Sequence, residues 1–203
     1  MQELTALLNQ TEFRDDIIQA ITRPAEAKPW YQYRPIFVTE QRARGGLEFW
    51  NANQDLLARV EAQYGVPAEI LVAIIGVETR YGSYRGSYRV LDALNTLAFS
   101  YPRRGSFFRS ELEQFLLLTR EEDVDVNNVR GSYAGAMGMP QFISSSYRHY
   151  AVDFDGDGKR DLWNSTADVI GSVANYFREH GWKPGRPGRF YLKNMTVKRS
   201  SIT

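Results

Sequence analysis

The chain has 203 residues, 43% of them hydrophobic, which suits one sizeable core. Its 25 Lys and Arg nearly balance 24 Asp and Glu, so a net charge of +1 gives no support for nucleic-acid binding by bulk charge. The absence of cysteine excludes disulfides, cysteine-ligated zinc, a thiol nucleophile and lipid attachment to cysteine, while two histidines, His149 and His180, are too few for a histidine-rich metal site.

The first part of the chain reads as helices separated by proline-rich segments. Apolar residues at helical spacing predict a helix over Leu4–Ile21. The aromatic segment 28–35 is bounded by prolines and predicts extended chain. A longer helix is predicted from about Thr39 to Tyr64, because Gly65 is a common residue just past a helix end.

The next predicted helix, Pro67 to about Arg80, is apolar on nearly all sides and should be central and buried. Its apolar run, Ile70–Val77, is too short to span a bilayer. Further helices are predicted at about 91–100, 104–120 and 167–180, the last ending at His180-Gly181. No long segment alternates with period two, so the class is mainly α with at most a small sheet.

Glu78 is the most informative residue of the buried helix. It follows Ile74 by four residues and Ile70 by eight, on a stripe that its neighbours mark as buried. Burial and the negative end of the helix dipole should both raise its pKa. A carboxyl group that is protonated near neutral pH can act as a general acid. The position of Glu78 alone is equally consistent with a structural ion pair with Arg80.

Two further segments carry polar groups that a ligand could use. Tyr81 and Tyr84 follow the acid and suit a sugar cleft, although core packing explains tyrosines equally well. The glycine-rich segment 131–142 permits close backbone approach and presents Ser132 and Gln141. Taken alone, this segment is better explained as a connecting loop.

A metal-binding loop is a stronger signal. Segment 153–161 places Asp153, Asp155, Asp157 and Asp161 at positions 1, 3, 5 and 9 of an EF-hand pattern, with Gly158 at position 6 and the Lys159 carbonyl at position 7. Position 12 is Asn164 instead of glutamate, and the nearest replacement is Asp168, which implies a longer loop. We expect a structural calcium ion of modest affinity, with sodium or magnesium as alternatives.

Several segments together resemble the B-type membrane-bound lytic murein transglycosylases, a glycoside hydrolase family with a lysozyme-like catalytic core. The similarity runs from about Phe13 to Trp182. The segments that carry it are Gly76–Gly82, Leu91–Phe99, Tyr101–Arg104, Ala134–Phe142, Asp153–Trp163 and Gly171–Phe177.

The resemblance implies an α+β lysozyme-like enzyme that cleaves the β-1,4 bond between N-acetylmuramic acid and N-acetylglucosamine and leaves a 1,6-anhydromuramyl end. Glu78 matches the family's single catalytic acid/base, and the substrate's N-acetyl group assists, so no second catalytic carboxylate is required. By the same resemblance, Ser132 and Gln141 contact sugar near the acid. Four further residues match positions along the glycan or peptide cleft: Tyr33, Arg103, Arg104 and Tyr176.

The resemblance also assigns the metal loop, whose ligands match at Asp153, Asp155, Asp157, Lys159 by its carbonyl, and Asp168. This loop, 153–168, lies within a catalytic domain that covers 1–203. Where relatives carry a segment that closes the active site, this chain has a basic, polar tail after Pro184. We therefore expect the C-terminal part of the domain to be absent.

The implied partners are peptidoglycan strands and proteins of cell-wall synthesis or hydrolysis, with the chain a monomer in the periplasm or at the outer membrane. No secretory signal or lipid-bearing cysteine is expected in the chain as written. Two alternative functions are a muramidase that uses water as acceptor, and a calcium-stabilised peptidoglycan-binding module with impaired catalysis.

Overall fold

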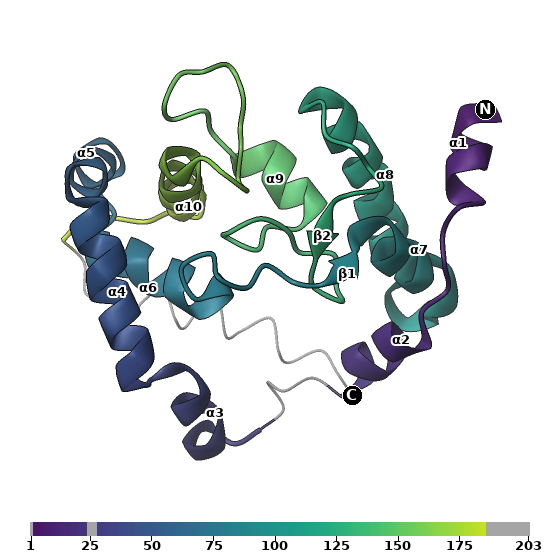
Figure 1. Ribbon diagram of the computed structural model, residues 1–203, viewed down its shortest axis with the longest axis horizontal. Coiled ribbons are helices and arrows are strands. Elements are labelled where there is room, and N and C mark those ends of the chain that lie inside the picture. The colour runs from purple at the N-terminus through teal and green to yellow at the C-terminus, as the bar shows by residue number, and fades with distance from the viewer. Residues whose placement is uncertain (1, 24–27, 186–203) are drawn as a thin grey trace.

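A computed structural model describes residues 2–23 and 28–185, and nearly all of its regular structure is helical (Figure 1). The helices of the first half are α1 (Gln2–Leu8), α2 (Asp15–Thr22), α3 (Trp30–Phe37), α4 (Glu40–Ala52), α5 (Gln54–Tyr64) and α6 (Ala68–Thr79). Those of the second half are α7 (Val90–Ser100), the 3-10 helix η2 (Pro102–Arg104), α8 (Gly105–Glu121), α9 (Ser144–Tyr150) and α10 (Thr166–Glu179). The mainly α class is confirmed.

The helix predicted over Leu4–Ile21 is interrupted, which corrects that prediction. Between α1 and α2, backbone N–H groups bond to side chains of α7 instead of continuing a helix. Glu12 N donates to Asp92 Oδ1 at 3.0 Å, and Arg14 N donates to Thr96 Oγ1 at 3.2 Å. These bonds attach the start of the chain to α7.

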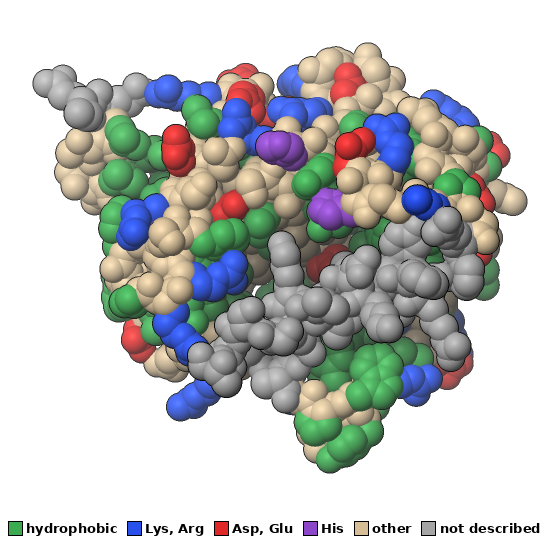
Figure 2. Space-filling model, turned by 180° about the vertical axis from the view of Figure 1, so that it is seen from behind, with side chains coloured by type: hydrophobic (Ala, Val, Ile, Leu, Met, Phe, Trp, Pro, Cys, Tyr) green, Lys and Arg blue, Asp and Glu red, His purple; other side chains and the backbone are tan. Residues whose placement is uncertain are grey.

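The prediction of extended chain over 28–35 is wrong, because residues 30–37 form α3. Pro29 precedes the helix, and Pro35 lies inside it. The aromatic rings meet at helical spacings: Trp30 and Tyr33 at 6.3 Å, Tyr33 and Phe37 at 4.9 Å between centroids. Contacts between residues three and four apart stabilise a helix and outweigh the disfavoured proline. Figure 2 shows hydrophobic side chains over α3, where Trp30 and Tyr31 are 69% and 72% exposed.

The long helix predicted from Thr39 to Tyr64 is two helices. It breaks at Asn53, whose backbone leaves the helical region at φ −126° and ψ 23° and whose side chain donates to Phe49 O at 2.8 Å. The prediction that Gly65 ends the helix is confirmed, because α5 ends at Gly65 in the left-handed conformation with φ +67°.

Helix α6 packs against α4, α5 and α10 and begins after Pro67. Leu71, Val72 and Ile75 are buried in the core, as predicted. The opposite face is open, however: Ala73 is exposed and Val77 is 41% exposed. The prediction of a helix buried all round is therefore only partly correct.

The second half of the chain builds a helical pair joined to a small irregular sheet. Helices α7 and α8 form the most extensive packing between two elements. Strand β1 (Tyr88–Arg89) pairs antiparallel with β2 (Arg130–Gly131), in the register Tyr88 to Gly131 and Arg89 to Arg130. This is the only sheet among the described residues, which fits the prediction of at most a small one.

Within residues 2–23 and 28–185, no single helix is long and apolar enough to cross a membrane. Only the pair α5 and α6, bent by 112°, meets the length and composition of a span.

Candidate active site

Glu78 is the second-to-last residue of α6, and its side chain is exposed. The prediction that it lies on a buried stripe is wrong in this respect. Ile70 and Ile74 on the same stripe are only half-buried, so the stripe leaves the core toward the end of the helix. The adjacent Thr79 is 1% exposed, because the helix turns its other face inward there.

The pKa of Glu78 is nevertheless raised, and desolvation by the surrounding protein is the cause. A side chain can touch solvent and still be desolvated when much protein surrounds its carboxyl, as on a concave surface. Among the described residues, the Glu78 carboxyl has neither a hydrogen bond nor an ion pair, with Arg80 or any other cation. An uncompensated carboxyl of this kind is suited to hold a proton.

The turn after Glu78 runs through three consecutive residues with positive φ: Arg80 at 51°, Tyr81 at 59° and Gly82 at 83°. Such angles are unfavourable for residues with a side chain and persist only where contacts enforce them. The Thr79 hydroxyl supplies two of these contacts. It donates to Met139 O at 2.8 Å and accepts from Gly82 N at 3.0 Å. The turn is thus bonded directly to the glycine-rich segment.

Tyr81 supplies the other contacts. Its hydroxyl donates to Arg42 O at 2.9 Å, and its ring stacks on Phe49 at 5.6 Å between centroids. The ring fits between α4 and α6 because both helices have glycine there. A Cβ at Gly46 or Gly76 would lie 2.6 Å or 2.4 Å from the Tyr81 oxygen. We did not identify Thr79 or Tyr81 as positioning residues from the sequence, where the glycines were the only available signal.

The glycine-rich segment lies along this turn, and its two predicted site residues make internal hydrogen bonds. Ser132 Oγ accepts from Ala134 N at 3.2 Å and from Ala136 N at 3.1 Å. Gln141 has φ +52°, and its amide donates to Arg85 O at 3.2 Å and Gly138 O at 2.9 Å. The Ser132 hydroxyl hydrogen remains available to a ligand.

Tyr176 on α10 approaches this region, whereas Tyr33 lies on α3 among the aromatic rings of that helix. The half-buried Tyr176 ring lies 5.6 Å from Phe142 at the end of the glycine-rich segment, and 5.0 Å from Tyr150. Burial raises the Tyr176 pKa. Tyr33 belongs to α3, where it contacts Phe37, and Arg42 of α4 lies 5.1 Å from the Phe37 ring.

Arg103 and Arg104 lie elsewhere, on η2 between α7 and α8. Both are exposed, and the Arg104 guanidinium lies 4.1 Å from the Phe107 ring. No hydrogen bond or ion pair of the described residues joins either arginine to the turn after α6. The structure therefore brings Ser132, Gln141 and Tyr176 to the end of α6 through shared contacts but leaves the two arginines apart from that group.

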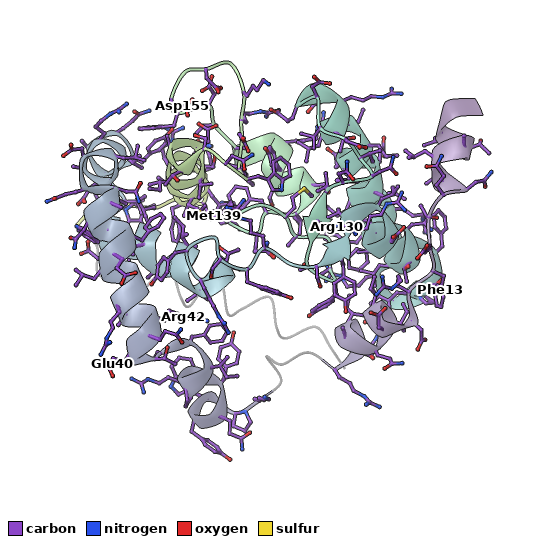
Figure 3. All side chains as sticks on the ribbon, viewed as in Figure 1. Phe13, Glu40, Arg42, Arg130, Met139 and Asp155 are labelled. Carbon is purple, nitrogen blue, oxygen red and sulfur yellow. The ribbon has the colours of Figure 1, made fainter. Side chains whose placement is uncertain are left out.

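The predicted metal loop brings three of its carboxylates together. Asp153, Asp155 and Asp168 each offer an oxygen, and these oxygens all lie within 4.8 Å of one another. Asp157 is outside this group and accepts from Lys159 N at 2.8 Å. Figure 3 shows Asp155 in the loop that projects beyond α9 and α10.

Asp168 connects both arms of this loop. It is fully buried at the start of α10, where Oδ1 accepts from Phe154 N at 2.7 Å and Oδ2 accepts from Asp161 N at 2.8 Å. Burial raises its pKa most strongly, and Asp155 adds to the shift while these two N–H groups oppose it. Asn164 is not part of the cluster, and its side chain donates to Asp161 Oδ2 at 3.0 Å. Three clustered carboxylates fit an oxygen-preferring cation such as calcium.

The chain is similar throughout to lytic transglycosylases. The model of the family described as "Transglycosylase SLT domain" matches residues 1–200. Membrane-bound lytic murein transglycosylase B of Escherichia coli (strain K12) is 48% identical over 194 residues, which are 91% of this chain. The crystal structure of soluble lytic transglycosylase SltB1 from Pseudomonas aeruginosa superimposes with a TM-score of 0.87 at 56% identity over 92% of this chain.

The Escherichia coli lytic transglycosylase Slt35, solved in complex with calcium, gives a TM-score of 0.86 at 49% identity over 92% of this chain. The matched part is 54% of the Escherichia coli transglycosylase B, 63% of the SltB1 chain and 59% of the Slt35 chain. The chain thus spans between one half and two thirds of the length of these relatives. The similarity confirms the predicted lysozyme-like fold class.

Proposed function

Because this chain belongs to the transglycosylase SLT domain family, we propose that it is a lytic transglycosylase acting on peptidoglycan in the periplasm. The bond that it cleaves is the β-1,4 bond between N-acetylmuramic acid and N-acetylglucosamine. Murein is the material named for the 48% identical relative, which supports this choice of substrate.

In this proposal Glu78 is both the acid and the base. Its carboxyl proton goes to the glycosidic oxygen as the bond from that oxygen to C1 of the muramyl residue breaks. The resulting carboxylate then takes the proton of the C6 hydroxyl while O6 bonds to C1, with assistance from the N-acetyl group. The products are a free 4-hydroxyl and a 1,6-anhydromuramyl end, and no water is consumed.

The observation that carries the proposal is the state of the Glu78 carboxyl. It is accessible to a ligand, it has no described ion-pair partner, and desolvation raises its pKa. An ordinary surface glutamate would be ionised near neutral pH and a poor acid. The two contacts of Thr79 hold the end of α6 against the glycine-rich segment, which gives the acid a fixed position relative to Ser132.

We further propose that six residues bind the substrate. Ser132 and Gln141 contact the sugar next to the acid, and Tyr176 lies beside the same segment. Tyr33, Arg103 and Arg104 extend this surface along the glycan or its peptides, where guanidinium groups can pair with carboxylates.

The products of digestion distinguish this activity from hydrolysis. We expect the protein to release muropeptides from purified sacculi that end in 1,6-anhydromuramyl residues, lighter by one water than hydrolysed ends. Mass spectrometry of the soluble products measures the difference. Reducing muramyl ends alone would identify a muramidase, and binding to sacculi without release would identify a glycan-binding module.

We also propose that the metal loop holds a structural calcium ion. Asp153, Asp155 and Asp168 fit such an ion, and we infer that Asp157 and the Lys159 carbonyl complete the set. The ion would neutralise the clustered carboxylates and stabilise the loop. The calcium complex of Slt35, at 49% identity, supports this choice of metal.

Calcium should raise the melting temperature of the protein. At a concentration about 100 times its Kd, we expect an increase of about 5–10 °C relative to chelator, because binding then adds about 2.7 kcal/mol. Differential scanning calorimetry measures the shift. Asp153→Asn should remove the calcium response, whereas Asp55→Asn, an exposed substitution on α5, should retain it. Equal melting temperatures with calcium and chelator would contradict the ion.

A further inference from the structure

A cavity adjoins the turn after Glu78. Its volume is about 710 Å³, and it lies between the end of α3, the first turns of α4 and the turn after α6. Its walls include Ile36, Gln41, Arg42, Arg80 and Tyr81. Arg80 follows Glu78 by two residues in the sequence, so the cavity borders the turn that begins just after the candidate acid. The volume is within the usual range for small-molecule sites.

The cavity contains two arginines without carboxylate partners among the described residues. Arg42 is half-buried, lies over the Phe37 ring, and donates to Val77 O only at the limiting distance of 3.5 Å. Arg80 is exposed, and no ion pair of the described residues includes it. Figure 3 shows Arg42 on the side of α4 that faces α6. Both guanidinium groups are thus available to an anion.

The acidic groups of the cavity offset these charges only in part. Glu40 lies on the outer side of α4 and forms an ion pair with Arg44 at 2.5 Å, and both of these side chains are more than 70% exposed. Glu48 is exposed on the next turns of α4. With three arginines and two glutamates at its border, the cavity has a net positive charge and favours an anionic ligand.

The backbone segments that carry the two arginines are joined to each other. The Arg42 carbonyl accepts the Tyr81 hydroxyl, which joins α4 to the turn that contains Arg80. The Arg42 N–H donates to Thr39 Oγ1 at 3.2 Å, which caps the start of α4. The two guanidinium groups therefore extend from backbone segments of defined separation, which favours binding of one anion by both.

We propose that this cavity binds a carboxylate of the peptide that branches from the muramyl residue. This inference rests on the proposed function, because it assumes that the substrate is peptidoglycan. While the peptide is attached, the lactyl carboxyl of the muramyl residue is an amide, so the peptide carboxylates are the anionic groups that two arginines would select. Removal of the peptide frees the lactyl carboxylate, which lies at the sugar and not at the distance of the peptide carboxylates. The cavity then makes cleavage depend on the peptide at a site separate from the six residues proposed above to bind the substrate.

Two substrates test this dependence: glycan chains with peptides, and the same chains stripped by an amidase. Arg42→Gln and Arg80→Gln should each lower kcat/KM on the peptide-bearing chains about tenfold, as expected for one lost charge-assisted contact. Activity on stripped chains should stay within about twofold. The Arg42 variant retains its carbonyl and therefore the bond to Tyr81. Arg59→Gln is the control, because Arg59 is an exposed arginine on α5 that does not line the cavity.

Titration of the free amidase-released peptide by calorimetry provides a second measurement. The wild type should bind it, and the Arg42 and Arg80 variants should bind it at least about tenfold more weakly. An equal loss of activity on both substrates would overturn the proposal, because Arg42 would then act by positioning α6. Variants with unchanged kcat/KM on both substrates would overturn it as well. If the wild type cleaves neither substrate, the proposed function fails. The titration alone then tests whether the cavity binds the peptide.

Discussion

Glu78→Gln should lower the rate of sacculus digestion by about 10²–10⁴-fold, the usual contribution of general acid–base catalysis. The amide has nearly the same shape but has no proton that it can transfer. Release of soluble muropeptides measures the loss. Glu69→Gln is the matched control on the same helix, because Glu69 is exposed in the first turn of α6 and should leave the rate unchanged.

The same variant should fold normally. The wild-type carboxyl is desolvated, so its charged form is disfavoured in the folded protein at neutral pH. A neutral amide avoids this effect, and the melting temperature should therefore stay the same or rise. Loss of activity with loss of folding would instead indicate a structural role for Glu78.

The pH dependence follows from the direction of the shift. The protonated carboxyl is the acid, so the rate should fall as pH rises through the pKa of Glu78. Because that pKa is raised above the ordinary value of 4.5, the fall should occur at higher pH than for an ordinary glutamate.

Retention of more than about a tenth of the activity by the Gln variant would contradict the assignment of Glu78 as the acid.

Gly86→Ala should have the largest effect on stability. Gly86 has φ +91°, and a Cβ there would lie 2.1 Å from both the carbonyl carbon and oxygen of Gly131. The obstruction is backbone, which cannot rotate away as a side chain can. We expect the free energy of unfolding to fall by about 3 kcal/mol or more, because dihedral strain and overpacking add.

Gly181→Ala separates these two contributions. Gly181 has a similar φ of +83°, but nothing lies within 4 Å of a Cβ at that position. Its substitution should therefore cost only the strain, about 1–2 kcal/mol. Urea unfolding measures both variants. Equal losses of unfolding free energy would show that the close approach of Gly86 to Gly131 adds nothing to the cost. The segment after α6 would then be free to move away from β2.

Local signals in the sequence predicted the helix ends well. Gly65 and Gly181 adopt positive φ after α5 and α10. Termination of a helix by glycine depends on the local backbone, so it can be predicted from the sequence. The break at Asn53 could not be predicted, because apolar periodicity continues through it. Helix α3 was missed because its aromatic contacts outweigh two prolines. Helix α9, also missed, is short and polar, and it depends on Tyr147, which is buried in the core.

The chemistry of the site was easier to predict than its exposure. The raised pKa of Glu78 has the predicted direction, although its cause is desolvation alone. Its exposure could not be predicted, since it depends on how the other helices pack around the end of α6. For the metal loop, three of the predicted ligands, Asp153, Asp155 and Asp168, lie together, whereas Asp157 lies outside this cluster and stays a predicted ligand. Which carboxylates converge depends on how Asp168 connects the two arms.

The double hydrogen bond of Thr79 has a consequence for how the protein tolerates sequence change. In most enzymes, errors in position add up along the chain of elements between two functional groups. Here one hydroxyl spans the gap between the segment after Glu78 and Met139, although 60 residues separate Thr79 from Met139 in the sequence. A substitution elsewhere that shifts one of these two segments should therefore shift the other with it, so that the acid and the glycine-rich segment keep their relative geometry.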